Sequence, residues 1–273
     1  MIADELNASD HRRLAQFVAK TAGIQLPENK KSLIESRLRH RQIQLGHATL
    51  GEYIDYALDH APQEQPLLID ALTTNKTDFF REQVHFDVLA SQLKPLLASH
   101  SNLNIWSAGC STGEEPYTIA MVLDHHRPSA GGYAFHILAT DISISCLAYA
   151  RQATYSAERI EPVPERFRRR YLLRSRDPQR QLIRIAPEVR STITFAEFNL
   201  IRGNFSQLDL FDVIFCRNVM IYFSTEQRRR LIERFRGQLN AGGLLFVGLS
   251  EGISANRELF HQISPSVYRK HGN

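Results

Sequence analysis

From about residue 100 onward, short continuous runs of apolar residues alternate with longer segments of helical periodicity. We expect strands at 104–106, 135–139, 211–215 and 244–249, each of them apolar along its length. A strand that is apolar on both faces must be covered on both faces, and the intervening helices supply that cover. The pattern therefore predicts an α/β fold with a doubly wound, mostly parallel sheet, in which ligands bind beyond the carboxyl ends of the strands.

The expected helices lie between these strands. One opens at Glu114-Glu115-Pro116, where proline suits the first turn, and another begins at about Ser143. A third is indicated by apolar residues at helical spacing and should stop at Ala241-Gly242-Gly243. These apolar residues are Leu231, Ile232, Phe235 and Leu239.

Residues 153–197 interrupt the alternation. Their four prolines break helices, and we expect a helix at Pro164–Tyr171 followed by an antiparallel hairpin made of Leu182–Ile185 and Thr192–Phe195. All eleven cations of residues 151–198 are arginines, which suits a planar anionic partner or, equally, a solvated basic face. The segment is therefore predicted to be a small β-subdomain inserted into the sheet domain.

The first 75 residues or so predict a small all-helical domain. Leu14, Phe17 and Val18 indicate one helix, and later helices are expected at about Leu50–Ala57 and Leu67–Leu72. Between them, a helix after Pro27 carries an apolar stripe beside a basic stripe. The apolar stripe consists of Ile34, Leu38 and Leu45, and the basic stripe of Lys30, Arg37 and Arg41. Such a helix face could dock a partner helix, or it could be an internal face with solvated cations.

Composition excludes several classes of protein. With 43% hydrophobic and 23% charged residues in 273, the chain is not mainly disordered, collagenous or coiled-coil. No apolar run is long enough to cross a membrane, and the N-terminus has no secretory pattern. The three cysteines form no C-x-x-C pair, so we expect no metal site, no disulfide framework and a cytoplasmic location.

Four polar constellations follow the predicted strands or precede the sheet. The turn at 107–113 joins a strand to a helix with small residues, but it is neither G-x-G-x-x-G nor a Walker A loop. Asp141 ends the next strand and could bind a ribose or cap a helix. Residues 216–223, Cys-Arg-Asn-Val-Met-Ile-Tyr-Phe, end the third strand, and residues 73–82 join the helical domain to the sheet.

Together these strings resemble the chemotaxis receptor methyltransferases of the CheR family. The resemblance covers nearly the whole chain and rests on Thr-Thr-Asn-x-Thr-x-Phe-Phe-Arg at 73–81, Trp-Ser-Ala-x-x-Ser-Thr-Gly-Glu-Glu-Pro-Tyr at 106–117 and the string at 216–223. It implies a class I methyltransferase that transfers a methyl group from S-adenosylmethionine to glutamate carboxylates of chemotaxis receptors, leaving S-adenosylhomocysteine. It further implies a helical N-terminal domain at 1–80, a methyltransferase domain at 81–273 and a β-subdomain at 153–197.

The resemblance also implies roles for single residues. Asn75, Thr77 and Arg81 would close over the cofactor, and Arg81 and Tyr222 would flank the transferred methyl group. Asp141 would hold the ribose. The other implied cofactor residues are Glu115 (less readily Glu114), Asn199 and Leu200 around the adenine, and Arg217 and Asn218 in the same pocket.

The same resemblance bears on partners. The helical domain and the hairpin would face the cytoplasmic helical region of a methyl-accepting receptor, without insertion into the membrane, and the chain would act as a monomer. Residues 174–184 have the length of a hairpin that grips a receptor's C-terminal peptide, but lack the usual glycines, so tethering stays open. Cys110 stands where a small apolar residue is expected.

Two other functions compete with receptor methylation. A nucleic-acid methyltransferase would explain the arginines, but the Asn/Asp-Pro-Pro-Tyr type of tetrad is absent from the sequence. A non-catalytic S-adenosylmethionine-binding signalling module would keep the pocket without turnover. A glutamate carboxylate, with a reference pKa of about 4.3, is ionised at neutral pH and needs no general base. The enzyme interpretation therefore requires positioning of the carboxylate rather than a catalytic His or Cys.

Overall fold

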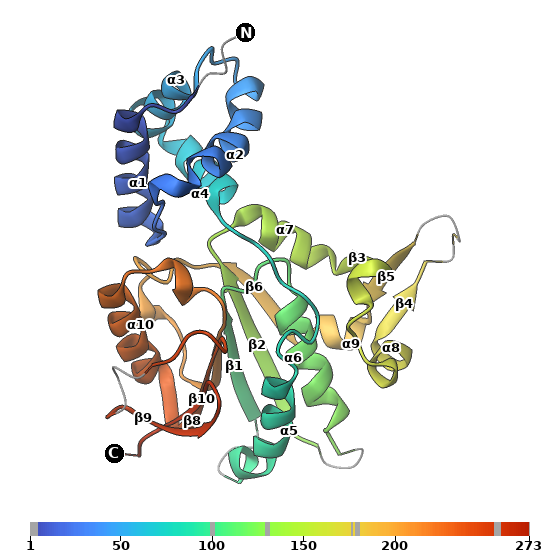
Figure 1. Cartoon of the computed structure of the whole chain (residues 1–273). Helices are drawn as coiled ribbons and strands as arrows, with labels where there is room; N and C mark the ends of the chain where they lie inside the picture. The colour runs from blue at the N-terminus through green and yellow to red at the C-terminus, as the bar shows by residue number, and fades with distance from the viewer. Residues whose placement is uncertain are drawn as a thin grey trace.

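The computed structural model describes residues 5–98, 102–128, 132–175, 177, 181–253 and 258–272. Seven strands form one mixed sheet in the order β6-β2-β1-β7-β8-β10-β9 (Figure 1). The first five strands in this order pair in parallel, and β10 and β9 pair antiparallel at one edge. The strands are β1 (Asn102–Ala108), β2 (Ala134–Asp141), β6 (Ile193–Glu197), β7 (Phe211–Cys216), β8 (Leu239–Val247), β9 (Phe260–Ser264) and β10 (Val267–Lys270).

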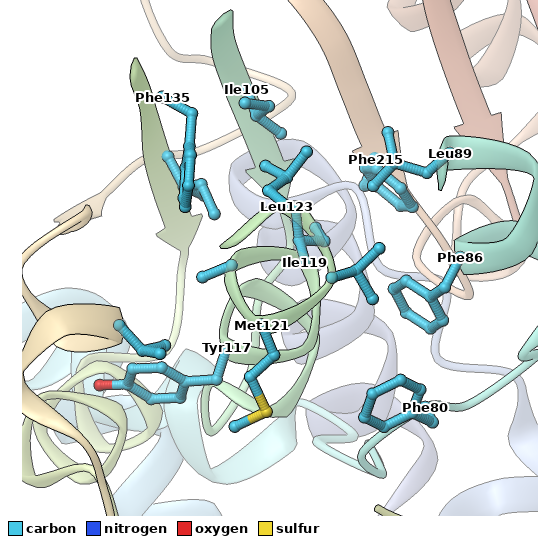
Figure 2. Packing of buried hydrophobic residues seen from close by; sticks show 14 of the residues in the cluster. Phe80, Phe86, Leu89, Ile105, Tyr117, Ile119, Met121, Leu123, Phe135 and Phe215 are labelled. Carbon is cyan, nitrogen blue, oxygen red and sulfur yellow. The ribbon is translucent and has the colours of Figure 1, made fainter. Parts of the chain in front are cut away.

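Helices cover both faces of this sheet, as the apolar strands require. One face carries α5 (Val84–Leu97), α6 (Glu114–His125) and α7 (Ile144–Gln152), and the other carries α10 (Thr225–Gln238). Figure 2 shows side chains of α5 and α6 packed on residues of β1, β2 and β7, all in one cluster. All six residues of β7 are buried, so the prediction of a doubly wound parallel sheet is confirmed.

A second sheet, of three antiparallel strands, lies at the side of the molecule in the order β3-β5-β4 (Figure 1). Its strands are β3 (Thr154–Ser156), β4 (Leu172–Arg174) and β5 (Leu182–Ile185), with α8 (Glu165–Tyr171) before β4 and α9 (Pro187–Arg190) after β5. The predicted helix at Pro164–Tyr171 is confirmed, with Pro164 as its N-cap. Part of the arginine-rich segment 174–184, including residues 176 and 178–180, lies outside the described residues.

The other strand of the predicted hairpin was placed wrongly. Thr192–Phe195 falls in β6, which pairs in parallel with β2 at the edge of the main sheet, from Ile137 opposite Ile193 to Asp141 opposite Glu197. An edge strand is covered less completely than a central one, so its residues alternate in polarity as in an antiparallel strand. The sequence pattern therefore could not distinguish these two partners.

The predicted stop at Ala241-Gly242-Gly243 was also wrong. The helix α10 ends at Gln238, because Leu239 adopts an extended conformation, and β8 begins there. The pairing of β8 with β7 shifts register between Phe211 and Val213, and Gly242 has a φ of +72°. The glycines therefore permit an irregularity within a strand rather than ending a helix.

The N-terminal residues form the predicted all-helical domain around a core of their own. Its helices are α1 (Ala8–Ala22), α2 (Lys31–Gln44), α3 (Leu50–Asp55), a π-helical turn at Tyr56–His60, and α4 (Gln65–Leu72). Short 3-10 turns at Glu28–Lys30 and Pro62–Glu64 precede α2 and α4. Polar contacts that join this domain to the sheet domain include Asn199 to the carbonyl of Thr21, Gln25 N to the carbonyl of Tyr222, and Ser143 to Asp70.

Two of the three residues in the predicted apolar stripe face inward, whereas the third, Leu45, follows the end of α2 and is 37% exposed. Ile34 is 2% and Leu38 0% exposed, so the suggestion that this stripe docks a partner helix is wrong for both. The neighbouring cations are also engaged: Arg37 donates to the carbonyl of Leu72 at 2.7 Å, and Arg41 binds Glu64 through two hydrogen bonds of 2.6 and 2.7 Å. Periodicity identified the helix face correctly but not what covers it.

The Arg41–Glu64 pair makes a prediction about stability. The Glu64 side chain is only 5% exposed and also accepts from the Tyr53 hydroxyl, so Arg41→Ala leaves a buried carboxylate without its cation. We expect a loss of about 2–3 kcal/mol in the free energy of unfolding at pH 7, measured by urea denaturation. Arg12→Ala, at an exposed position of α1, is the control and should change the free energy of unfolding by less than about 0.5 kcal/mol.

The effect should depend on pH with a definite sign. The hydrogen bonds from Arg41 hold the pKa of Glu64 below its ordinary value, despite burial. A carboxyl with a depressed folded-state pKa stabilises the fold above its unfolded pKa and loses that contribution as pH falls through the folded value. The difference between wild type and Arg41→Ala should therefore shrink below about pH 4. A difference that stays constant down to pH 3 would contradict this assignment.

Candidate active site

The main cavity lies where the strand order reverses. From β1 the chain continues to β2 on one side, while β7 occupies the other, and the loops after these strands diverge around a hollow of about 1000 Å³ that is open in part to solvent. The linker 73–81 closes it from the side of the helical domain. Every predicted site residue lines this cavity: Asn75, Thr77, Arg81, Glu115, Asp141, Asn199, Leu200, Arg217, Asn218 and Tyr222.

The turn after β1 brings the backbone close to the cavity. Gly109 has a φ of +92°, and a Cβ there would lie 2.5 Å from a methyl carbon of Val219. Only glycine avoids both the strain and the clash. Ser111, also at positive φ, donates its backbone N–H to Asp141 at 2.7 Å and its hydroxyl to the carbonyl of Asn75 at 2.9 Å. The turn thus binds both the end of β2 and the linker.

Asp141 ends β2 and does not act as the helix cap. Ser143 caps α7 by accepting from Cys146 N, while Asp141 accepts from the backbone N–H groups of Ser111 and Ser143 at 2.7 and 2.9 Å. Burial raises the pKa of Asp141, and these two N–H groups oppose the rise. The carboxylate is held by the backbone at the cavity wall, where it can accept hydrogen bonds from a ligand.

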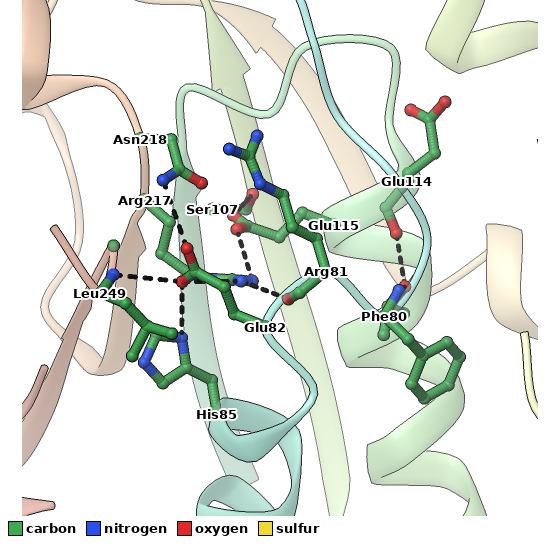
Figure 3. Close-up of polar contacts among 12 residues, drawn as sticks. Phe80, Arg81, Glu82, His85, Ser107, Glu114, Glu115, Arg217, Asn218 and Leu249 are labelled. Carbon is green, nitrogen blue, oxygen red and sulfur yellow. Dashed lines mark hydrogen bonds and ion pairs between the residues drawn. The ribbon is translucent and has the colours of Figure 1, made fainter. Parts of the chain in front are cut away.

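Glu115 rather than Glu114 faces the cavity. Glu115 accepts from the Ser107 hydroxyl at 2.7 Å and pairs with Arg217 at 3.3 Å, whereas the Glu114 side chain points away from them (Figure 3). Glu114 pairs instead with Arg159 at 2.8 Å. Successive residues on a helix point about 100° apart, so the two carboxylates cannot share a direction. Burial raises the pKa of Glu115, and the charge of Arg217 opposes the rise.

Arg217 is the centre of a buried polar network. Its side chain is 3% exposed and donates to the carbonyl of Arg81, to Glu82 at 3.2 Å and to Glu115 at 3.3 Å (Figure 3). The guanidinium also lies 5.3 Å from the centre of the Phe86 ring. All of these contacts serve the protein itself, so Arg217 fixes the linker and Glu115 in place.

Glu82 is a functional residue to which sequence reasoning assigned no role. It accepts hydrogen bonds from Arg217, from the Asn218 amide at 3.3 Å and from Leu249 N at 3.3 Å. Burial opposes its ionisation, but Arg217 and Asn218 outweigh burial, so the pKa of Glu82 lies below its ordinary value. Its place directly after Arg81 in the string 73–82 was the available signal. Its distant partners follow from the fold alone.

Arg81 sits between two strained residues. Phe80 and Glu82 both have a φ of +55°, a conformation that is uncommon for residues other than glycine and is found where surrounding contacts enforce it. The Arg81 guanidinium lines the cavity and donates to the carbonyl of Lys76 at 2.9 Å. Within the described part of the chain it forms no ion pair, which leaves a cation available to an anionic ligand.

Asn199 and Asn218 line the cavity, and each also makes hydrogen bonds within the protein. The Asn199 side chain donates to the carbonyl of Thr21 and accepts from the N–H groups of Ile201 and Arg202. It therefore shapes the loop after β6 and has its amide already engaged. Asn218 adopts a φ of +58°, and its N–H donates to Glu251 at 2.6 Å. Glu251 also accepts from Gly248 and Ile221 and is a further buried organiser that sequence analysis missed.

The described part of the chain contains neither a metal-binding cluster nor a membrane-spanning helix. No group of three or more His, Cys, Asp or Glu side chains is arranged to hold a metal ion. Among the same residues, no helix is both long enough and apolar enough to cross a bilayer.

Comparison with known proteins decides the family. Residues 75–269 match the description "CheR methyltransferase, SAM binding domain", and residues 9–73 match "CheR methyltransferase, all-alpha domain". The chain belongs to the CheR methyltransferase family. The chemotaxis protein methyltransferase 2 of Pseudomonas aeruginosa is 39% identical over 95% of this chain and 92% of its own length. The chemotaxis protein methyltransferases of Borreliella burgdorferi and Escherichia coli are 40% and 36% identical over 94% and 96% of this chain, covering 93% and 91% of their own lengths.

This CheR methyltransferase uses S-adenosylmethionine as its cofactor, and the cavity fits that ligand. A nucleoside needs a hydrogen-bond acceptor for its ribose hydroxyls, which Asp141 on the cavity wall would supply, and a close backbone approach, which Gly109 would permit. A sulfonium cation needs a negative surrounding, and Asp141 and Glu115 line the cavity. The bound cofactor would supply an electrophilic methyl group, while the protein supplies orientation and exclusion of water.

The position of Asp141 makes a prediction about cofactor affinity. Asp141→Asn replaces one carboxylate oxygen with an amide that cannot accept both backbone N–H groups and a ribose hydroxyl. We expect the Kd for S-adenosylhomocysteine, measured by isothermal titration calorimetry, to rise about 10- to 50-fold. Exposed Asp209→Asn should leave the Kd unchanged. An unaltered Kd in Asp141→Asn with an intact fold would remove Asp141 from the binding site.

Proposed function

We propose that this CheR methyltransferase esterifies glutamate side chains in the cytoplasmic helical region of chemotaxis receptors. The curated relatives are named as chemotaxis protein methyltransferases, which supports chemotaxis receptors as the class of substrate. Residues 1–80 would face the receptor, 81–273 would carry the chemistry, and 153–197 would form the inserted part. The chain would act as a cytoplasmic monomer, outside the membrane.

The observation that carries the choice of a carboxylate acceptor is Arg81. Its guanidinium lies on the cavity wall and makes no ion pair among the described residues, while nearby Arg217 already forms ion pairs with Glu82 and Glu115. A guanidinium binds a carboxylate through paired hydrogen bonds with defined geometry. Arg81 would therefore orient the ionised acceptor carboxylate in the cavity.

The remaining residues prepare the reaction without a proton transfer. A glutamate acceptor is ionised at neutral pH, so no base is required. The rigid linker and the buried network around Arg217 hold Arg81 in place, and Tyr222, which lines the same cavity, would exclude water. Well-oriented reactants can lower a barrier by roughly 7–11 kcal/mol, which makes positioning the main contribution.

The function is tested by transfer of tritiated methyl groups from S-adenosylmethionine to membranes that contain the cognate receptors. Label that mild alkali releases as methanol identifies a carboxyl ester and supports the proposal. Alkali-stable label on protein would indicate nitrogen methylation. Cofactor binding without label would favour the non-catalytic signalling module, and salt-sensitive transfer to nucleic acid would favour a nucleic-acid methyltransferase.

Arg81 gives the sharper prediction. Arg81→Ala should lower kcat by about 100-fold or more, because the acceptor loses a charge-assisted contact in the reacting complex, while the Kd for S-adenosylhomocysteine changes less than about 5-fold. Arg202→Ala, on an exposed loop, is the charge-matched control and should alter neither value. Equal losses in kcat and in cofactor affinity would make Arg81 a cofactor clamp instead.

A further inference from the structure

The small inserted sheet touches the cofactor-binding turn and the linker directly. Two of its residues, Tyr155 on β3 and Arg159 in the turn that follows, make these contacts. Neither residue lines the cavity, and neither lies in the sequence motifs at 73–81, 106–117 and 216–223. Their partners, however, lie immediately beside residues that do line it.

Tyr155 contacts both the turn after β1 and the linker. It is fully buried, and its hydroxyl donates to the carbonyl of Thr112 at 2.7 Å. A Cβ on Gly113 would lie 2.9 Å from that hydroxyl, so glycine is needed for the turn to approach the ring so closely. The ring also packs edge-on against Phe79 of the linker, with centroids 4.9 Å apart. One side chain therefore sets the distance between the turn and the linker.

Arg159 holds the other end of the turn. It pairs with Glu114 at 2.8 Å, donates to the Thr112 hydroxyl at 3.4 Å and lies over the ring of Tyr149 at 5.6 Å. Glu114 is 0% exposed, and Thr112 donates to it at 2.7 Å. Burial raises the pKa of Glu114, and the Thr112 hydroxyl and the charge of Arg159 oppose the rise, so Arg159 stabilises the ionised carboxylate and with it this orientation of the first turn of α6.

We propose that Tyr155 and Arg159 are positioning residues, through which the inserted sheet holds the turn 109–113 and Glu115 in the conformation that binds S-adenosylmethionine. Thr112 and Glu114 alternate along the chain with Ser111, Gly113 and Glu115. Ser111 orients Asp141, and Glu115 faces the cavity. The contacts that hold Thr112 and Glu114 on the side away from the cavity therefore also hold Ser111 and Glu115, which lie next to them in the chain and line the cavity. This inference depends on the cofactor site alone and is independent of which acceptor is methylated.

The test compares Tyr155→Phe, Arg159→Ala and Arg159→Lys in the full-length protein. Tyr155→Phe keeps the ring against Phe79 and removes only the hydrogen bond to Thr112. We expect the Kd for S-adenosylhomocysteine, measured by calorimetry, to rise about 5-fold in Tyr155→Phe and about 10- to 30-fold in Arg159→Ala. Arg159→Lys, which retains the charge, should recover most of the affinity.

The matched control is Arg169→Ala. Arg169 lies on the same inserted subdomain, but its side chain is 80% exposed and pairs with an exposed Glu165, so its loss should leave the Kd unchanged. In methyl transfer, KM for S-adenosylmethionine should rise in Tyr155→Phe while kcat at saturating cofactor stays within about 2-fold. A split of this kind separates positioning of the turn from damage to the reacting centre.

A purely structural role predicts a different result. In that case Tyr155→Phe and Arg159→Ala would lower the melting temperature, but the folded protein would bind S-adenosylhomocysteine with wild-type affinity, and this outcome would overturn the proposal. A double-mutant cycle with Glu114→Gln gives a second check. If Arg159 acts through Glu114, the two changes in binding free energy should be clearly less than additive, and full additivity would contradict the assigned route.

Discussion

A single buried guanidinium joins the parts of this site. Arg217 leaves the end of β7 and reaches the carbonyl of Arg81, Glu82 on the linker and Glu115 on α6. A buried cation needs opposite charge beside it, and the carboxylates of Glu82 and Glu115 supply that charge here, while the carbonyl of Arg81 accepts a hydrogen bond from the same guanidinium. The linker is therefore fastened to the sheet by electrostatics, and the strained backbone around Arg81 persists because these contacts enforce it.

The same network sets the charge that a ligand meets. Because Arg217 is held by Glu82 and Glu115, it does not act as a free positive charge in the cavity, whereas Arg81, bound only to a carbonyl, does. Asp141 adds a negative charge at the far wall. The cavity is thus lined by both the cation of Arg81 and the carboxyl group of Asp141, and under the proposed function these would face the anionic acceptor and the cofactor.

Sequence reasoning located the site because its residues occupy strand ends. The positions of Asp141, Arg217 and the turn at 107–113 follow from the order of the strands, and a parallel sheet gathers its carboxyl ends at one edge. Contacts between residues that are far apart in the sequence could not be predicted. The tertiary fold determines that Thr192–Phe195 lies beside β2 and that Arg41 pairs with Glu64. Sequence periodicity predicts which face of an element is apolar, but it does not predict what packs against that face.

The adjacent residues Glu114 and Glu115 belong to one sequence motif, but the motif does not reveal that their side chains have different partners. Both carboxylates occupy the first turn of α6 and point in different directions (Figure 3). Glu115 pairs with Arg217 beside the cavity, and Glu114 pairs with Arg159 of the inserted subdomain. Glu114 is buried and Glu115 is largely covered, and each pairs with its own arginine, so the turn before them is held by ion pairs with two distant parts of the chain. A short small-residue loop that would otherwise be mobile is in this way given one conformation, and the inserted sheet becomes part of the cofactor site although none of its residues lines the cavity.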